Sequence, residues 1–258
     1  MNGQAGAARQ VKGGTRGFSP APAPSVTAER EPLGTPRAEG PPILQLRGVT
    51  KRWKRGSEPV LDHVDLSLVR GTAVLLTGRN GAGKTTLLRV ASGVIFPDSG
   101  GVELQGFCPQ RSRREFSRRI TLLSAGGGGL YARLSVRSHL DLAGRLALLS
   151  RAERTAATDR LLDAFDLRAL TANRVDRLSM GQRQRVRVAM SFVHDPELAL
   201  LDEPTTSLDN HGVGLLHAAL SRMLSRGGAA IWCEPSGTRS DFGYDRRLVL
   251  QDGGLHAG

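Results

Sequence analysis

The fold of this chain is decided by residues 78–85, which read Gly78-Arg79-Asn80-Gly81-Ala82-Gly83-Lys84-Thr85 and fit the pattern G-x-x-x-x-G-K-[ST]. The three glycines let backbone N–H groups turn toward phosphate oxygens and approach them closely. Lys84, one of four lysines in the chain, can bridge the β- and γ-phosphates, and the Thr85 hydroxyl can bind Mg²⁺. The run therefore predicts a site that holds the phosphates of a nucleotide.

The segments on either side of this run fit a phosphate loop. Residues 73–76 are apolar and indicate a buried strand that ends at the loop. Residues 86–90 have the pattern of a helix, whose positive N-terminal end near Gly83 would face the phosphates. Thr86 opens that stretch and belongs to the expected nucleotide-binding set. An accidental glycine-rich turn is disfavoured because strand, loop and helix agree.

A second run supplies the carboxylates that a phosphate loop needs for its metal and for the attacking water. Residues 198–201 are apolar, and Asp202 and Glu203 follow at the carboxyl end of the strand that they predict, where α/β sheets place their ligands. Asp202 would hold Mg²⁺, mostly through water, and Glu203 would polarise the nucleophilic water. An apolar strand that ends in Asp-Glu is weak evidence for a metal and water site when taken alone. It becomes strong evidence in a chain that also contains the phosphate loop at residues 78–85.

Strands and helices alternate through most of residues 43–258. Apolar or alternating stretches predict further strands at 43–49, 64–68, 102–104, 120–123, 229–233 and 246–250, and helical spacing predicts helices at 135–165, 180–194 and 211–225. This order predicts an α/β fold with a P-loop NTPase core, a mainly parallel sheet and an antiparallel β region at the N-terminal side. The helical stretch at about 130–180 interrupts the alternation, so we expect it to form a separate lobe.

Residues 1–42 differ in composition from the rest of the chain. They hold seven of the 13 prolines, many Gly and Ala, and no hydrophobic period, which is typical of a disordered tail.

The net charge is +12; the tail's five basic and three acidic residues leave +10 for residues 43–258. The densest basic cluster is Arg111, Arg113, Arg114, Arg118 and Arg119. We expect it to be the solvated face of a helix.

Composition also indicates which classes of binding partner and which cellular compartment are expected for this protein. A basic domain favours anionic surfaces such as nucleic acid or the cytoplasmic leaflet, but aromatic residues make up 4% of the chain, which disfavours base stacking. Cys108 and Cys233 are too few for a disulfide framework and suit a reducing compartment. No apolar run approaches the roughly 18 residues that a membrane span needs. A soluble or peripheral protein is therefore expected.

Residues 178–182 give the sequence a specific family resemblance. They are Leu178, Ser179, Met180, Gly181 and Gln182, and they resemble the signature segment of ABC-type ATPases, whose usual form is L-S-G-G-Q. The segment lies about 20 residues before the strand that carries Asp202, as that family requires. Physically it is a helix N-terminus with a capping serine. Taken alone it would also fit an ordinary capped helix.

Further elements match the family in order over roughly residues 43–252. Trp53 stands where the family has an aromatic residue that stacks on adenine, and its polar neighbours favour that role over a place in the core. Residues 206–209, which include Ser207 and Asp209, resemble the D-loop. Residues 246–250 resemble the strand before the terminal hairpin.

The resemblance implies a mechanism and partners. ATP with Mg²⁺ would bind at residues 78–86 and Trp53, with Thr85 and Asp202 on the metal and Glu203 as the catalytic base. Two such domains, identical or different, pair head to tail, so that Ser179–Gln182 of one subunit complete the ATP site of the other. Closure on ATP and opening after hydrolysis drive an integral membrane subunit on another chain. The implied location is the cytoplasmic face of the membrane, and no direct contact with nucleic acid is expected.

Two positions depart from the family pattern. A glutamine that links the Mg²⁺ site to the membrane partner is usual after the strand at 120–123, and Ala125 stands there. A histidine that contacts the γ-phosphate is usual after the strand at 229–233, and Glu234 stands there. A carboxylate about 4 Å from a phosphate charge costs about 4 kcal/mol at an effective dielectric of 20. Glu234 must therefore turn away, be protonated or meet an arginine, and we expect slow turnover.

The sequence thus predicts the ATP-binding and ATP-hydrolysing subunit of an ABC transporter, and residues 185–190 are similar to those of bacterial exporters. One alternative is a soluble ABC protein that acts on ribosomes or nucleic acid, although such families carry two ATPase halves or long inserted arms. The other is a degenerate ATPase that serves as a regulatory module. Ala125 and Glu234 support this second alternative, and Glu203 opposes it.

Replacement of Lys84 tests the phosphate loop. Lys84→Ala removes the ammonium group that would contact the β- and γ-phosphates, so most of the affinity for Mg·ATP is expected to be lost in an equilibrium titration. Unchanged affinity in that titration would contradict the assignment of residues 78–85.

Overall fold

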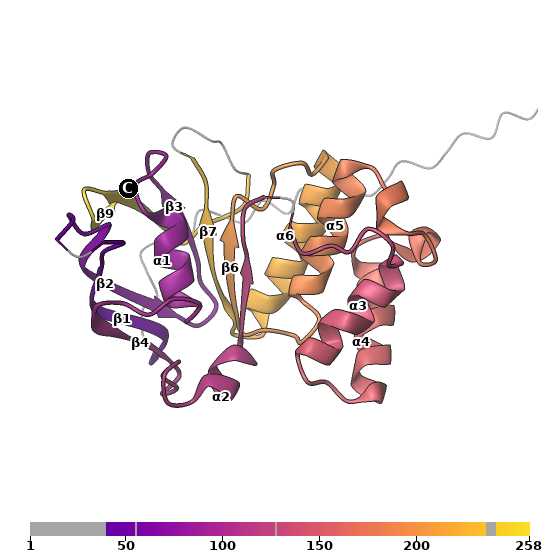
Figure 1. Ribbon diagram of the computed structural model, residues 1–258, viewed down its shortest axis with the longest axis horizontal. Coiled ribbons are helices and arrows are strands. Elements are labelled where there is room, and N and C mark those ends of the chain that lie inside the picture. The colour runs from indigo at the N-terminus through magenta and orange to yellow at the C-terminus, as the bar shows by residue number, and fades with distance from the viewer. Residues whose placement is uncertain (1–39, 55, 127, 236–240) are drawn as a thin grey trace, which may run out of the picture. The chain divides into compact units, whose positions relative to one another are not determined.

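The computed structural model describes residues 40–54, 56–126, 128–235 and 241–258. The predicted tail therefore lies outside the described residues except for positions 40–42, and Pro42 already belongs to the first strand. The predicted α/β fold is confirmed. It is built from one large and one small β-sheet with helices on both faces of the large sheet (Figure 1).

The large sheet brings the ends of distant segments to one edge. Its strands, in spatial order, are β5 (Ile120–Leu123), β6 (Leu198–Asp202), β7 (Ala229–Cys233), β3 (Ala73–Thr77), β8 (Arg246–Gln251) and β9 (Gly254–Ala257). All neighbours pair in parallel except β8 and β9. Because β3, β7 and β6 are adjacent and parallel, the residues that follow them share the carboxyl edge of the sheet.

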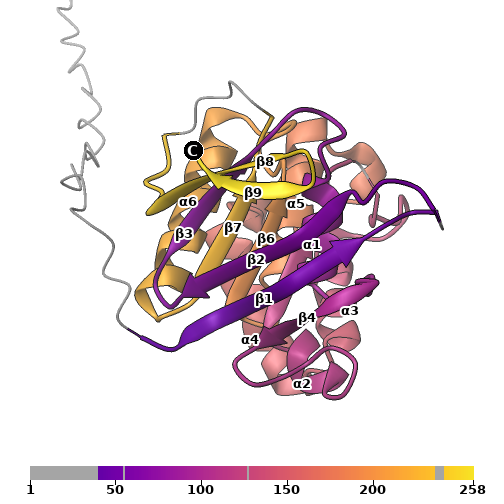
Figure 2. The same cartoon turned by 90° about the vertical axis from the view of Figure 1, so that its left-hand side faces the viewer.

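The small sheet forms the predicted antiparallel region. It contains β2 (Leu61–Val69), β1 (Pro42–Lys51) and β4 (Ser99–Leu104), in that spatial order. Figure 2 shows β1 and β2 side by side in front of the strands of the large sheet. Inward-facing residues such as Leu44, Leu66 and Leu104 are buried with Leu87 and Leu88 of α1 (Lys84–Ala91) in one hydrophobic core. This core fixes the helix that follows the phosphate loop.

A second core covers the other face of the large sheet. It contains buried residues of α3 (Val136–Leu146), α4 (Arg151–Ala164), α5 (Met180–Ser191) and α6 (Asn210–Ser225). In Figure 1, α6 and α5 lie next to the sheet and α3 and α4 lie beyond them. Short helices complete the chain: α2 (Arg113–Ser117), η1 (Arg168–Leu170) and η2 (Val175–Arg177). Within the described residues, none of these helices combines the length and the apolar character needed to cross a membrane.

The helix predicted over 135–165 is in fact two helices. Ala147 ends α3, and Leu148 adopts a left-handed backbone with φ of 59°. Ser150 then begins α4 with a capping box, in which its hydroxyl and the Glu153 carboxylate each accept a backbone N–H. Hydrophobic spacing alone did not reveal this break, because Leu148 continues the apolar pattern across it.

The basic cluster is mostly solvated, as predicted. Four of its arginines, Arg111, Arg113, Arg114 and Arg118, are exposed on or beside α2. Arg119 is half-buried because its guanidinium lies 4.3 Å from the centre of the Phe107 ring and forms an ion pair with Glu197 at 3.4 Å.

Candidate functional site

The loop at residues 78–83 is shaped by close backbone approaches. A Cβ atom at Gly78 would lie 2.6 Å from the carbonyl oxygen of Leu250. At Gly83 a Cβ atom would lie 2.7 Å from a methyl carbon of Val60, and φ there is 104°, in the region that favours glycine. These two glycines are therefore required by sterics before any ligand is considered. Gly83 caps α1, so the predicted placement of the helix N-terminus is correct.

The side chain of Lys84 lies inside the loop. It is buried, and its Nζ donates hydrogen bonds to the carbonyl oxygens of Gly78 at 2.7 Å and Arg79 at 3.2 Å. Two carbonyl oxygens of the loop thus hold the ammonium group of Lys84 at the start of α1, where a phosphate group would meet a positive charge. Arg79, Asn80 and Gly81 are exposed at the rim, Ala82 is half-buried, and Thr86 is buried in α1.

Thr85 and Asp202 are brought together from distant segments. The Thr85 Oγ1 donates a hydrogen bond of 2.7 Å to Oδ2 of Asp202, across 117 residues of sequence. Asp202 is buried at the end of β6. Two adjacent oxygens at the mouth of a phosphate loop fit Mg²⁺, which takes one or two protein ligands together with phosphate oxygens and water. The predicted metal pair therefore has suitable geometry.

Glu203 follows at the same edge with an unusual backbone. Its φ is 48°, a left-handed value that costs a non-glycine residue energy and persists only where the surroundings enforce it. Its N–H donates to the Cys233 carbonyl at 3.0 Å. The half-buried side chain lines a cavity of about 500 Å³ that Met180, Gln184 and Arg187 of α5 also line.

The charged groups of the site surround Cys233. Burial raises the pKa of the Cys233 thiol well above its ordinary value; the nearby carboxylates of Asp202, Glu234 and Glu203 add to the rise, and Lys84 opposes it. Cys233 pairs with Asp202 on one side and with Leu76 of β3 on the other. The buried thiol thus lies between the phosphate loop and the carboxylates.

Glu234 is turned toward the second core. It is 4% exposed, and its Oε1 accepts hydrogen bonds from the Trp232 indole N–H at 2.7 Å and the Thr205 hydroxyl at 3.1 Å. Both donors are neutral side chains, so the group that holds the carboxylate is not the arginine that the sequence left open as one of three arrangements. Residue patterns do not indicate these partners, since they predict Trp232 only as a strand residue.

The signature segment forms a capped helix start. The Ser179 hydroxyl accepts the Gln182 N–H at 3.2 Å, and the Gln182 side chain accepts the Ser179 N–H at 2.9 Å. Met180 is 71% exposed, and Gly181 lies against the carbonyl oxygen of Ser207. The segment is therefore presented to a surface, as its predicted role on another subunit requires.

Two further residues predicted for the site are Asp209 and Trp53. Asp209 caps α6, and its carboxylate accepts the Gly212 N–H at 2.7 Å. Trp53 is 55% exposed in the segment after β1, where it lines a hollow with Lys51 and Asp98. This segment reaches the phosphate loop through Val60, whose N–H is bonded to the Lys51 carbonyl.

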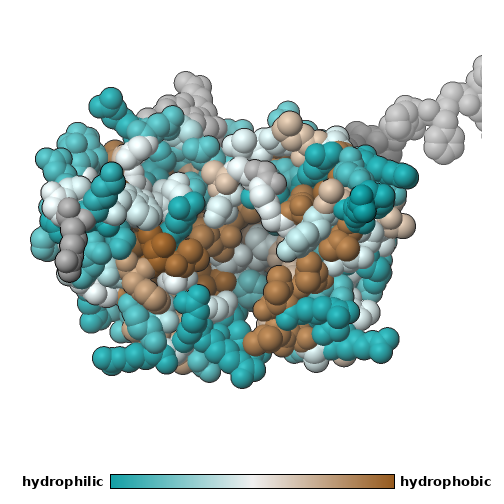
Figure 3. All heavy atoms as spheres, in the orientation of Figure 1, coloured by the Kyte–Doolittle hydropathy of each residue, from teal (hydrophilic) through white to brown (hydrophobic). Residues whose placement is uncertain are grey.

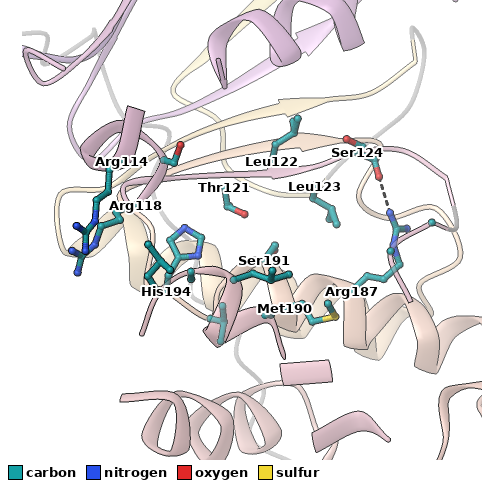
Figure 4. A pocket seen from close by; sticks show the side chains of 18 residues that line it. Arg114, Arg118, Thr121, Leu122, Leu123, Ser124, Arg187, Met190, Ser191 and His194 are labelled. Carbon is teal, nitrogen blue, oxygen red and sulfur yellow. Dashed lines mark hydrogen bonds between the residues drawn. The ribbon is translucent and has the colours of Figure 1, made fainter. Parts of the chain in front are cut away.

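Ala125 lies beside a large groove between β5 and the helices of the second core. Ala125 is exposed, and the neighbouring Ser124 lines a cavity of about 630 Å³ with apolar residues that include Leu122, Leu146 and Met190. Figure 4 shows Arg114 and Arg118 at one end and Arg187 at the other. Burial lowers the pKa of His194, so the arginines carry the charge. Hydrophobic side chains gather around the hollow on this face (Figure 3).

Sequence reasoning missed Arg187 and Gln184. Arg187 donates to the Ser124 carbonyl at 2.9 Å and to the Gln184 side-chain oxygen at 2.7 Å. Gln184 donates in turn to the Pro204 carbonyl at 3.1 Å. Arg187 lies within residues 185–190, whose likeness to bacterial exporters indicated no role for it, and the further signal was an arginine in an otherwise apolar stretch of the helix, Val186 to Ala189.

Comparisons with known proteins show the family of this chain. The profile described as ABC transporter matches residues 61–206. The chain is 39% identical to the ABC transporter ATP-binding protein NatA of Bacillus subtilis, over 65% of this chain and 69% of that protein. It is 41% identical to the daunorubicin resistance ATP-binding protein DrrA3 of Streptomyces coeruleorubidus, over 66% of this chain but about half, 52%, of that protein.

A solved structure shares the fold. The dimeric ATP-binding cassette MJ0796, determined in a post-hydrolysis state with ADP and Pi, superposes with a TM-score of 0.71 over 83% of this chain and 98% of that chain. Its sequence identity is 23%, so the likeness concerns the fold alone.

Replacement of Glu234 tests its contacts. Glu234→Ala leaves the buried indole N–H of Trp232 without its acceptor, and the free energy of unfolding in urea is expected to fall by about 1–3 kcal/mol. Glu234→Gln keeps an oxygen that can accept both donors, so its loss should be clearly smaller. Equal stability of the wild type and the alanine variant would show that the hydrogen bonds to Trp232 and Thr205 do not form.

Proposed function

Because the chain belongs to the ABC transporter family as an ATP-binding subunit, we propose that it binds and hydrolyses Mg·ATP and so drives a membrane subunit on another chain. The observation that carries the proposal is the 2.7 Å contact of Thr85 with Asp202. It places the end of one strand at the mouth of the phosphate loop formed after another. A nucleoside triphosphate is the ligand that needs a cationic loop and a metal pair side by side.

Each group of the site has a part in the proposed reaction. The loop N–H groups and Lys84 bind the β- and γ-phosphates, and Trp53 stacks on the adenine. Thr85 and Asp202 hold Mg²⁺, which when bound neutralises charge on the phosphate oxygens. Glu203 orients a water molecule and accepts its proton while the water oxygen attacks the γ-phosphorus. The bond to the β–γ bridging oxygen breaks, and ADP and phosphate leave.

A head-to-tail pair of subunits completes the proposed site. Ser179 and Gly181 would contact ATP held by the other subunit, and the exposed start of α5 supports this arrangement. The dimeric state named for MJ0796 supports it as well. The pair is either two copies of this chain or this chain with a different ATP-binding subunit.

The groove beside Ser124 is the proposed contact with the membrane subunit. Its apolar walls end in Arg114 and Arg118 on one side and Arg187 on the other. This surface fits an amphipathic helix that carries acidic side chains near its ends. The chain would then act at the cytoplasmic face of the membrane through this partner.

The proposed turnover is slow in the isolated chain. Ala125 has no side-chain donor or acceptor, and Glu234 is held by Trp232 and Thr205. Loss of one transition-state donor lowers a rate by about 10²–10³-fold. Since the signature segment keeps Ser179 and Gly181, such a chain could still complete an active site on a different subunit, which favours an asymmetric pair. A regulatory ATPase without turnover is the alternative that these same two positions support.

Replacement of Glu203 tests the proposed reaction. Glu203→Gln removes the base but keeps the size of the side chain, so ATP should stay bound while hydrolysis is lost. Size-exclusion chromatography with Mg·ATP is expected to show a larger species for this variant than for the wild type. Hydrolysis by Glu203→Gln at the wild-type rate would exclude Glu203 as the catalytic base.

Replacement of Glu234 by histidine tests the cause of slow turnover. Glu234→His supplies a donor for the γ-phosphate and is expected to raise kcat by up to about 10²-fold if that donor limits the rate. Steady-state phosphate release measures the change. Fast hydrolysis by the wild type, with no gain in Glu234→His, would mean that another group stabilises the γ-phosphate. Absence of turnover in both proteins would favour the regulatory alternative.

A further inference from the structure

Three consecutive hydrogen bonds connect the groove segment to the turn that carries Glu203. The Ser124 carbonyl accepts from Nη2 of Arg187 at 2.9 Å, which Figure 4 marks with a dashed line. Nη1 of Arg187 donates to Oε1 of Gln184 at 2.7 Å. Nε2 of Gln184 donates to the Pro204 carbonyl at 3.1 Å. We refer to Ser124, Arg187, Gln184 and Pro204 as the polar relay.

Both ends of the polar relay lie beside positions of functional interest. Ser124 precedes Ala125, whose methyl group can neither donate nor accept a hydrogen bond, and Pro204 follows Glu203 directly. Arg187 lines both the groove of about 630 Å³ and the cavity of about 500 Å³ that contains Glu203. The guanidinium therefore lies between the two, and its two donor groups point to opposite ends of the relay.

The inner part of the relay is held in a desolvated environment. Gln184 is 7% exposed, and burial lowers the pKa of Arg187 from its ordinary value. Hydrogen bonds of a buried charged group are stronger than those at the surface, and loss of one partner leaves the other unsatisfied. Loss of Arg187 or of Gln184 would therefore leave the other side chain without one of its hydrogen-bond partners, so the hydrogen bonds of the relay are expected to form and break together.

The turn that follows Glu203 needs such support. Glu203 has the left-handed φ of 48°, and within its turn the Thr206 N–H donates to the Glu203 carbonyl and the Leu208 N–H to the Thr205 carbonyl. Gln184 ties this turn to α5 through Pro204. The Pro204 carbonyl belongs to the Pro204–Thr205 peptide, so its hydrogen bond to Gln184 restrains the turn one residue beyond Glu203, and a shift of this peptide would be passed through Pro204 to Glu203.

We propose that Arg187 is a positioning residue that holds Glu203 in place through Gln184 and connects it to the groove at Ser124. This inference rests on the proposed function, because it assigns a role in the step that Glu203 catalyses. Arg187 thereby supplies a link that Ala125 cannot supply with its own side chain. An acidic group that binds in the groove would attract the Arg187 guanidinium away from Ser124. This movement would be transmitted through Gln184 to the turn that carries Glu203.

Steady-state kinetics of the full chain test the proposal. Arg187→Met keeps an unbranched apolar stem but removes the guanidinium donors, and Gln184→Leu removes the amide of the other relay side chain. Each is expected to lower kcat about tenfold, the effect of one lost hydrogen bond to a charged group, with the Kd for Mg·ATP changed less than twofold. Because the residues act in series, the double variant should be no slower than the slower single variant. A loss of kcat in the double variant equal to the product of the two single losses would overturn the proposal.

A matched control and a conservative variant separate positioning from general stability. Arg160→Met removes another half-buried guanidinium, which donates to the Phe192 carbonyl at 3.3 Å at the far end of α5 and does not line either cavity. Its kcat should equal that of the wild type. Arg187→Lys keeps the charge and one donor at a time, so an intermediate kcat is expected. A loss in Arg160→Met equal to that in Arg187→Met would overturn the proposal.

Amide hydrogen exchange tests the relay without any need for hydrolysis. Arg187→Met should raise exchange at Thr206 and Leu208, which Arg187 does not bond, as well as near Ser124. Arg160→Met should raise neither. Unchanged exchange at residues 206 and 208 in Arg187→Met would overturn the proposal. If the wild type fails to hydrolyse ATP, the proposed function fails, while this exchange result still decides whether the relay exists.

Discussion

The candidate site depends on one interaction, the hydrogen bond between Thr85 and Asp202. It joins two segments that are 117 residues apart, and it forms because β3, β7 and β6 are adjacent and parallel. The cationic loop after β3 and the carboxylates after β6 therefore meet at one edge of the sheet. Cys233 fills the space between them with a neutral, buried thiol, since burial raises its pKa. A different strand order would separate the two halves of the site.

Each of the two hydrophobic cores supports one part of the carboxyl edge of the large sheet. The core between the small sheet and the large sheet fixes α1, and through α1 it fixes the loop that surrounds Lys84. The second core fixes α5 and α6 against the opposite face, and α5 holds the turn after Glu203 through the hydrogen bond from Gln184 to Pro204. The phosphate-binding half and the carboxylate half are thus supported from opposite sides of the sheet. Motion of one core relative to the other would act directly on the site.

Prediction from sequence succeeded where a function is encoded in neighbouring residues. Gly83, Lys84 and Thr85 occupy a contiguous run whose strand and helix are visible as apolar patterns, and the structure has both. It succeeded less well where an orientation depends on residues from elsewhere. The carboxylate of Glu234 is set by Trp232 and Thr205, and no spacing rule indicates which way it turns. Leu148 falls inside the helical stretch predicted over 135–165 because a left-handed residue between two helices leaves the hydrophobic spacing almost unchanged.

The contrasting burial of the two tryptophans gives this protein a natural pair of optical reporters. Trp53 is 55% exposed in the segment before the phosphate loop, and Trp232 is 1% exposed with its indole N–H bonded to Glu234. Emission from an indole in water lies at longer wavelength than emission from a buried one, and soluble quenchers reach the first but not the second. The two halves of the site therefore carry separable fluorescence signals, so events at the loop and behind the sheet can be followed in one unlabelled sample.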